Sequence, residues 1–182
     1  MDKTYCVFGD SVTQAAYVPV GWVELLRQYL EQRYAQDFIN VFNLGIGGDT
    51  TSDVLRRFNS EALLRNPTSV IFAVGINDTK EDNPEKFENN LAELIGEAKR
   101  YTQGIIFIGL VLGDWQGVDP FSQDKTTRYN QLIKKIVRPK DCGFISLQEK
   151  LNAEDFQDGL HPNTQGHQKM FEVIREYFIA HA

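Results

Sequence analysis

Short apolar stretches alternate with longer amphipathic stretches along the whole chain. The apolar stretches carry few charges and many β-branched or aromatic residues, a pattern typical of strands that are buried on both faces. They predict five strands, at residues 4–8, 38–43, 69–74, 105–112 and 144–147. In the intervening stretches, apolar side chains recur every three or four positions, which indicates helices. These helices are predicted at residues 21–34, 52–64, 84–101, 125–137 and 164–180.

The third predicted helix shows this pattern most clearly. Leu91, Leu94 and Ile95 are spaced so that their side chains lie on one face of a helix. Asn83 is a favourable N-cap residue, and Pro84 suits the first helical position, where no backbone N–H is needed. The helix is therefore expected to begin at residue 84.

The regular alternation of strand and helix predicts the fold class. It implies βαβ units, which form a parallel sheet with helices on both faces. We expect a three-layer α/β/α sandwich around a five-stranded parallel sheet. No repeat, low-complexity tract or linker divides the sequence. The 182 residues are therefore expected to form a single domain.

Composition narrows the choice of partners and compartment. The chain is 42% hydrophobic and 24% charged, as in an ordinary globular protein, and its net charge of −6 with scattered basic residues argues against nucleic acid. No apolar run approaches the roughly 20 residues of a membrane span, and a strand begins without a preceding signal peptide, so a cytoplasmic location is expected. The two cysteines, Cys6 and Cys142, suggest neither a disulfide framework nor a metal site.

The candidate chemistry lies next to the strands. In sheets of this kind, ligands collect at the carboxyl ends of the strands. Three polar segments follow predicted strands and one precedes the last helix: Gly9-Asp10-Ser11, Gly48-Asp49-Thr50, Gly75-Ile76-Asn77-Asp78 and Asp158-Gly159-Leu160-His161. Together they would bring a hydroxyl, a glycine amide, a carboxamide and an Asp/His pair to one edge of the sheet.

These groups are the ones that acyl transfer requires. The Ser11 hydroxyl is a weak nucleophile until a base removes its proton, and the neutral imidazole of His161 can do so. A carboxylate at Asp158 can orient that imidazole and stabilise its charged form. The Ser11 and Gly48 N–H groups and the Asn77 side-chain amide can face the developing oxyanion.

The four segments resemble sequence blocks of the SGNH hydrolases, or GDSL-type esterases. Gly9-Asp10-Ser11 resembles block I and Gly48-Asp49-Thr50 resembles block II. Gly75-x-Asn77-Asp78 resembles block III, and Asp158-x-x-His161-Pro162 resembles block V. The blocks occur in the family's order and cover nearly the whole chain. One departure is Val12, where the family's signature has leucine, an exchange between two apolar residues.

The resemblance implies a flavodoxin-like fold and a serine esterase that needs no metal and no cofactor. It implies that Ser11 is the nucleophile, that His161 is the base oriented by Asp158, and that Gly48 and Asn77 complete the oxyanion hole. The substrate would be a small carboxylic ester or thioester, cleaved through an acyl-enzyme. Lysophospholipids and acetylated sugars are alternative substrates of the same site. The oligomeric state is left open.

Several of these residues also have purely structural interpretations. Ser11 and Asn77 can be turn residues, the latter in the left-handed region. Asp10 and Asp78 are expected to be structural, and Asp49 is a candidate cap of the following helix. Of the remaining histidines, one is expected on the surface or in packing and the other in a frayed terminus: His167 and His181.

The substrate side of the site is predicted less directly. With no room for a lid domain, we expect an open cleft that takes short acyl chains, up to roughly six carbons. Its apolar wall is predicted from five side chains: Val12, Ile76, Trp115, Phe121 and Leu160. The loop at 113–121 serves equally well as a cover over the edge of the core.

A binding module without catalysis is the competing function from another class. The pattern Gly45-x-Gly47 follows a strand and opens a helix, like the start of a dinucleotide-binding fingerprint. Thr50 stands where that fingerprint needs its third glycine. The intact Ser11, Asp158 and His161 favour an enzyme.

Overall fold

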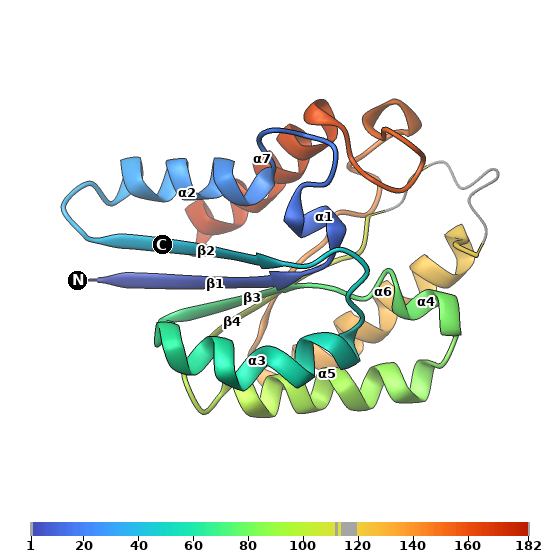
Figure 1. Cartoon of the computed structure of the whole chain (residues 1–182), viewed down its shortest axis with the longest axis horizontal. Coiled ribbons are helices and arrows are strands. Elements are labelled where there is room, and N and C mark those ends of the chain that lie inside the picture. Colours follow the sequence, from blue (N-terminus) through green and yellow to red (C-terminus); the bar gives the residue numbers. More distant parts are fainter. Residues whose placement is uncertain (1, 112, 114–119, 182) are drawn as a thin grey trace.

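The computed structural model describes residues 2–111, 113 and 120–181 (Figure 1). Its centre is a parallel sheet in the order β2-β1-β3-β4-β5, which is the flavodoxin-like order. The strands are β1 (Lys3–Gly9), β2 (Ile39–Gly45), β3 (Ser69–Ala73), β4 (Gly104–Ile108) and β5 (Gly143–Ile145).

Helices cover both faces of the sheet and complete the three layers, which confirms the predicted fold class (Figure 1). One face carries α2 (Trp22–Arg33) and α7 (Thr164–Ala180). The other carries α3 (Thr51–Arg65), α5 (Pro84–Ala98) and α6 (Gln123–Val137). Short elements lie in the connections: α1 (Ser11–Gln14), α4 (Asp78–Glu81), η1 (Arg138–Lys140) and η2 (Ala153–Asp155). Among the described helices, none is long and apolar enough to cross a membrane.

Each face of the sheet has its own core because successive strand residues point to opposite sides. Towards α3, α5 and α6, the rings of Phe8, Phe58 and Phe72 contact one another and Phe107 contacts Phe72, with centroid distances of 4.9 to 5.9 Å. On the α2 and α7 side, Val7 faces the opposite way and is fully buried. The sheet is therefore held rigidly from both sides, and its carboxyl edge is a fixed platform.

Helix starts agree with the sequence in one case and correct it in another. Asn83 caps α5 by accepting a hydrogen bond from the Lys86 N–H, as predicted. The cap of α3 is Thr50, which forms a capping box with Asp53. The prediction that Asp49 caps this helix is therefore wrong.

The fourth strand ends earlier than the pattern of apolar residues suggests. The sequence predicts a strand to residue 112, but β4 ends at Ile108. The cause is a side chain of α6: the Asn130 amide accepts from the Leu110 N–H at 2.7 Å and donates to the Leu110 carbonyl at 3.1 Å. These bonds take the place of a strand ladder. The edge strand β2 is only partly buried, unlike the central strands.

Candidate active site

Ser11 is the first residue of α1, which begins where β1 ends. Asp10 caps this helix in an extended conformation, and its carboxylate accepts a hydrogen bond from the Val12 N–H at 2.9 Å. The helix packs tightly onto the end of β2, where a Cβ on Gly45 would lie 2.4 Å from the Gln14 nitrogen. Gly45 therefore makes room for the helix that carries Ser11, rather than for a phosphate.

Ser11, His161 and Asp158 form a continuous chain of hydrogen bonds. Ser11 Oγ lies 2.8 Å from His161 Nε2, and His161 Nδ1 lies 2.7 Å from Asp158 Oδ2. Since the carboxylate can only accept at neutral pH, we assign the proton to Nδ1, which leaves the Nε2 lone pair facing the serine. Asp158 Oδ1 also accepts from the His161 backbone N–H at 2.8 Å and from the Leu160 N–H at 3.0 Å. The turn thus fixes both members of the pair.

The surroundings of Asp158 keep its carboxyl group ionised. Partial burial acts to raise its pKa. The hydrogen bonds from the His161 backbone and ring and from the Leu160 N–H outweigh this, so the pKa of Asp158 lies below the usual range for an aspartate. An ionised carboxylate at this position can hold the imidazole and stabilise its protonated form.

Gly48 and Asn77 come from the ends of the strands on either side of β1. Gly48 has a φ of +87° and no neighbour within 4 Å of where a Cβ would be. Glycine is therefore favoured by the left-handed backbone conformation and not by a lack of room for a side chain. Asn77 has helical angles, φ −71° and ψ −26°, and not the left-handed ones considered from the sequence. Its side-chain amide donates to the Asp49 carbonyl at 3.1 Å. This bond ties the Gly48–Asp49 turn to the end of β3.

Arg57 is a residue of this region that sequence reasoning missed. From α3, its Nε and Nη2 donate to Asp49 Oδ2 at 2.9 and 2.8 Å, and Nη2 also donates to the Leu44 carbonyl at 2.7 Å. The pair is largely buried, with side-chain exposures of 16% and 12%. Arg57 therefore holds the turn that bears Gly48. The spacing of Asp49 and Arg57 is not that of a local helix pair, so no sequence signal indicated it.

The remaining acidic and histidine side chains have structural partners. Asp78 accepts hydrogen bonds from the Thr51 N–H and hydroxyl, as expected for a structural residue. His167 is buried in α7, and its Nδ1 accepts from the Trp22 N–H at 3.3 Å. Burial, with a smaller contribution from His161, lowers the pKa of His167 to about 4. His167 is thus a packing residue. Among the described residues, no cluster of His, Cys, Asp or Glu is placed to hold a metal ion.

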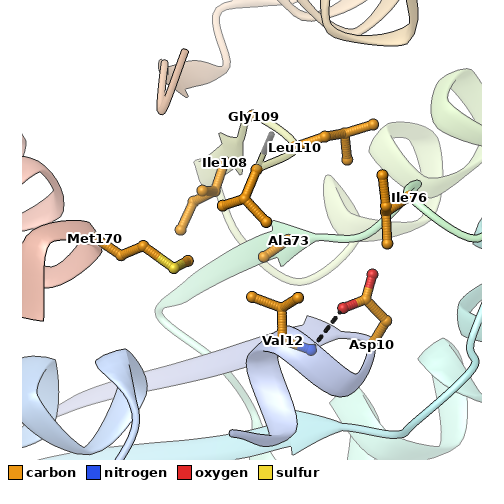
Figure 2. Close-up of a pocket in the computed structure, with 9 residues that line it drawn as sticks. Asp10, Val12, Ala73, Ile76, Ile108, Gly109, Leu110 and Met170 are labelled. Atoms are coloured by element: carbon orange, nitrogen blue, oxygen red, sulfur yellow. Dashed lines mark hydrogen bonds between the residues drawn. The ribbon is translucent and has the colours of Figure 1, made fainter. Parts of the chain in front are cut away.

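A small apolar cavity of about 20 Å³ lies against residues that follow the ends of β1 and β3 (Figure 2). Two of its lining residues are neighbours of site residues in the sequence: Val12 follows Ser11, and Ile76 precedes Asn77. Its other walls come from the ends of β1, β3 and β4 and from α7: Asp10, Ala73, Ile108, Gly109, Leu110, Val111 and Met170. The cavity is thus bordered by two of the residues predicted to contact the acyl group.

The other three predicted substrate contacts are placed differently. Leu160 is half-buried next to His161. Phe121 is buried, and the Lys80 ammonium lies 5.0 Å from its ring centroid, which favours a role in covering the core. Trp115 lies outside the described residues.

Comparisons with known proteins identify esterases and acylhydrolases as relatives. The model of the GDSL-like lipase/acylhydrolase family matches residues 7–169. An acetylxylan esterase of Geobacillus stearothermophilus is 26% identical over 166 residues, covering 81% of this chain and 75% of the relative. The human platelet-activating factor acetylhydrolase IB subunit alpha2 is 28% identical over 182 residues, covering 93% of this chain and 78% of the relative.

Solved structures share the fold. The acetylxylan esterase Axe2 from Geobacillus stearothermophilus superposes with a TM-score of 0.82 at 23% identity, covering 96% of this chain and 93% of that chain. LAE5, an alpha/beta hydrolase enzyme from the metagenome of Lake Arreo in Spain, also gives 0.82, at 21% identity, with 96% and 94% coverage. This chain, Axe2 and LAE5 thus share the three-layer architecture.

Proposed function

Because this chain belongs to the GDSL-like lipase/acylhydrolase family and is a carboxylic ester hydrolase, we propose that Ser11 is its nucleophile. The observation that carries the proposal is the chain of hydrogen bonds from Ser11 Oγ through the imidazole of His161 to Asp158. A serine, a base within hydrogen-bond reach and a group that orients the base are the requirements of nucleophilic acyl transfer.

In the first half of the reaction, Ser11 Oγ bonds to the carbonyl carbon while His161 Nε2 takes the hydroxyl proton. The tetrahedral intermediate carries its negative charge on the former carbonyl oxygen. Its collapse breaks the bond to the alcohol oxygen, which takes the proton from His161 and leaves. Water then attacks the acyl-enzyme by the same route and releases the carboxylic acid. Asp158 remains ionised throughout and stabilises the imidazolium that forms twice in each cycle.

The oxyanion is stabilised by donors from three neighbouring strand ends. These are the backbone N–H groups of Ser11 and Gly48 and the side-chain amide of Asn77. The Asn77 amide has two N–H groups, of which one holds the Asp49 carbonyl, and we assign the other to the oxyanion. Since these donors are fixed before the reaction, they stabilise the transition state without reorganisation.

The acyl group that fits best is a short one. The cavity between Val12 and Ile76 has a volume of about 20 Å³. A single water needs roughly 10–15 Å³, so this space is about the size that the methyl group of an acetyl ester requires. Each further CH₂ left in water forgoes about 0.8 kcal/mol of burial. The names of the two relatives, an acetylxylan esterase and a platelet-activating factor acetylhydrolase, both refer to acetyl esters. We therefore infer an acetyl esterase.

The proposal is tested by labelling and by an ester panel. An organophosphonate probe is expected to add to Ser11, and Ser11→Ala is expected to abolish hydrolysis of p-nitrophenyl acetate. Ser60→Ala is the matched control because Ser60 is an exposed serine of α3. In the wild type, kcat/KM is expected to fall from acetyl to hexanoyl esters, and EDTA is expected to have no effect.

Two outcomes would contradict it. Full activity in Ser11→Ala, or a probe adduct mapped to another residue, would refute the assignment of the nucleophile. A preference of the wild type for long-chain lysophospholipids over all short esters would refute the inference from the size of the cavity.

A further inference from the structure

We propose that the exposed ring of Tyr17 is the binding platform for the alcohol part of the ester, and that it favours alcohols built on a flat ring. The proposal rests on the function proposed above and adds a specificity-determining residue on the side of the leaving group. Tyr17 lies in the loop between α1 and α2, close in sequence to Ser11.

The contact that carries the inference is between Tyr17 and His161. Their ring centroids are 5.1 Å apart and their planes meet at 78°. Tyr17 is 72% exposed, whereas the His161 side chain is only 14% exposed. Tyr17 therefore borders the imidazole and still offers most of its own surface to another molecule.

The chemistry of the proposed reaction places the alcohol at this position. The oxygen that leaves must lie within hydrogen-bond reach of His161 Nε2 to receive its proton. In the proposed mechanism the oxyanion is bound by Gly48 and Asn77, and the acyl group lies against Val12. The alcohol part of the substrate must therefore extend from His161, and among the described residues Tyr17 has its aromatic ring in contact with that imidazole.

The backbone at Tyr17 supports the same conclusion. Its φ is +69°, in the left-handed region that bulky non-glycine residues rarely adopt. The loop is held there by hydrogen bonds from the Ala16 N–H to the Ser11 carbonyl at 3.0 Å and from the Val18 N–H to the Ala15 carbonyl at 3.3 Å. A ring that stays exposed gains little from burial to offset a strained backbone. Strain of this kind is typical of functional sites.

A single planar ring discriminates between alcohols by contact area. A sugar presents a flat face of C–H groups and an aryl alcohol presents a π face, and both can lie against tyrosine. A short alkyl alcohol covers much less of the ring. From the usual strength of aromatic contacts, the preference for ring alcohols is expected to be roughly three- to tenfold.

The experiment measures a ratio, so that changes common to all esters cancel. The substrates share the acetyl group: benzyl acetate, a monoacetylated methyl xyloside and, as reference, ethyl acetate. Tyr17→Asn removes the ring and keeps a residue that tolerates left-handed angles, while Tyr17→Phe keeps the ring. Leu64→Asn is the control for losing an exposed apolar side chain, because Leu64 is 80% exposed near the far end of α3.

For Tyr17→Asn, the kcat/KM of each ring ester relative to ethyl acetate is expected to fall roughly three- to tenfold, mainly through KM. Tyr17→Phe keeps the ring and is expected to retain the wild-type ratio of kcat/KM values. A fall with only one of the two ring esters identifies that alcohol class as the ligand.

An unchanged ratio for both ring esters would overturn the proposal. An equal loss of activity on all three esters would also overturn it, because Tyr17 would then support the imidazole rather than bind the alcohol. The proposed esterase mechanism fails separately, by activity that survives in Ser11→Ala.

Discussion

The buried carboxyl group of Asp10, next to the proposed nucleophile in sequence, is expected to make the stability of the protein depend on pH. Asp10 is only 2% exposed and caps the helix that begins with Ser11. One of its oxygens accepts from the Val12 N–H, and the carboxyl group lies at the wall of the small cavity (Figure 2). Burial raises the pKa of Asp10 to about 7, the Val12 N–H opposes this, and the carboxylates of Asp78 and Asp49 add to the rise.

The sign of the effect on stability follows from proton binding. In the unfolded chain the carboxyl group has its ordinary pKa of 3.8, against about 7 in the folded protein. Between these values the folded state holds a proton that the unfolded state has lost. The free energy of unfolding therefore decreases as pH rises from about 4 to about 7, by at most about 1.4 kcal/mol per pH unit.

Asp10→Asn removes this dependence while keeping the shape and an acceptor for the Val12 N–H. The new amide NH₂ faces an apolar cavity and costs about 1–3 kcal/mol, but at every pH alike. The change in the free energy of unfolding between pH 5 and pH 8 therefore reports only the ionisation of Asp10. Relative to the wild type, the variant is expected to gain roughly 2–3 kcal/mol in free energy of unfolding between these two pH values.

Urea denaturation of both proteins at pH 5 and pH 8 measures this difference. Asp124→Asn, at an exposed aspartate in the first turn of α6, controls for the general effect of removing one negative charge. If the stability difference between Asp10→Asn and the wild type is the same at both pH values, the argument from burial is refuted. A gain at pH 5 that disappears at pH 8 would refute it as well.

Three further predictions concern activity. Asp158→Asn is expected to lower kcat by roughly 10⁴-fold with the fold intact, because the amide favours the wrong tautomer of His161; stopped-flow hydrolysis and circular dichroism check this. Asn77→Ala is expected to lower kcat by roughly 10²–10³-fold with little change in KM, and an effect on KM alone would make Asn77 a substrate-binding residue. Arg57→Lys loses the paired contact with Asp49, and a shift in the Gly48 turn is expected to lower kcat about tenfold at unchanged KM. A lowered melting temperature with unchanged kcat would make Arg57 purely structural.

The parts of the molecule that sequence could predict are those fixed by short-range patterns. The alternating apolar stretches identified all five strands, and Asn83 with Pro84 marked the start of α5. The pairing of Asp158 and His161 is also local, since one turn brings them together. The helices α1 and α4 were not predicted because a helix of one turn is too short to show a period.

Contacts that depend on the packing of distant elements could not be predicted in this way. Arg57 reaches the Leu44 carbonyl only because α3 packs beside the end of β2, and Asn130 ends β4 from a helix that comes later in the chain. Tyr17 adopts a left-handed backbone without a glycine or asparagine to signal it. Phe121 was a candidate for the acyl wall because it is apolar in a polar loop, and that pattern is the same for a residue that covers the core.

The register of the sheet explains why the candidate site can be assembled from segments that are far apart in sequence. Gly9 pairs with Gly45 on one side and with Ala73 on the other, so the three strands end level with one another. Ser11, Gly48 and Asn77 each follow one of these paired residues within a few positions. Their separation is then set by hydrogen-bonded strands, whose spacing is about 4.8 Å, rather than by flexible loops. Tyr17 has no such support from the sheet and depends on its loop, so substitutions in that loop can alter the choice of alcohol while the donors and the nucleophile keep their places.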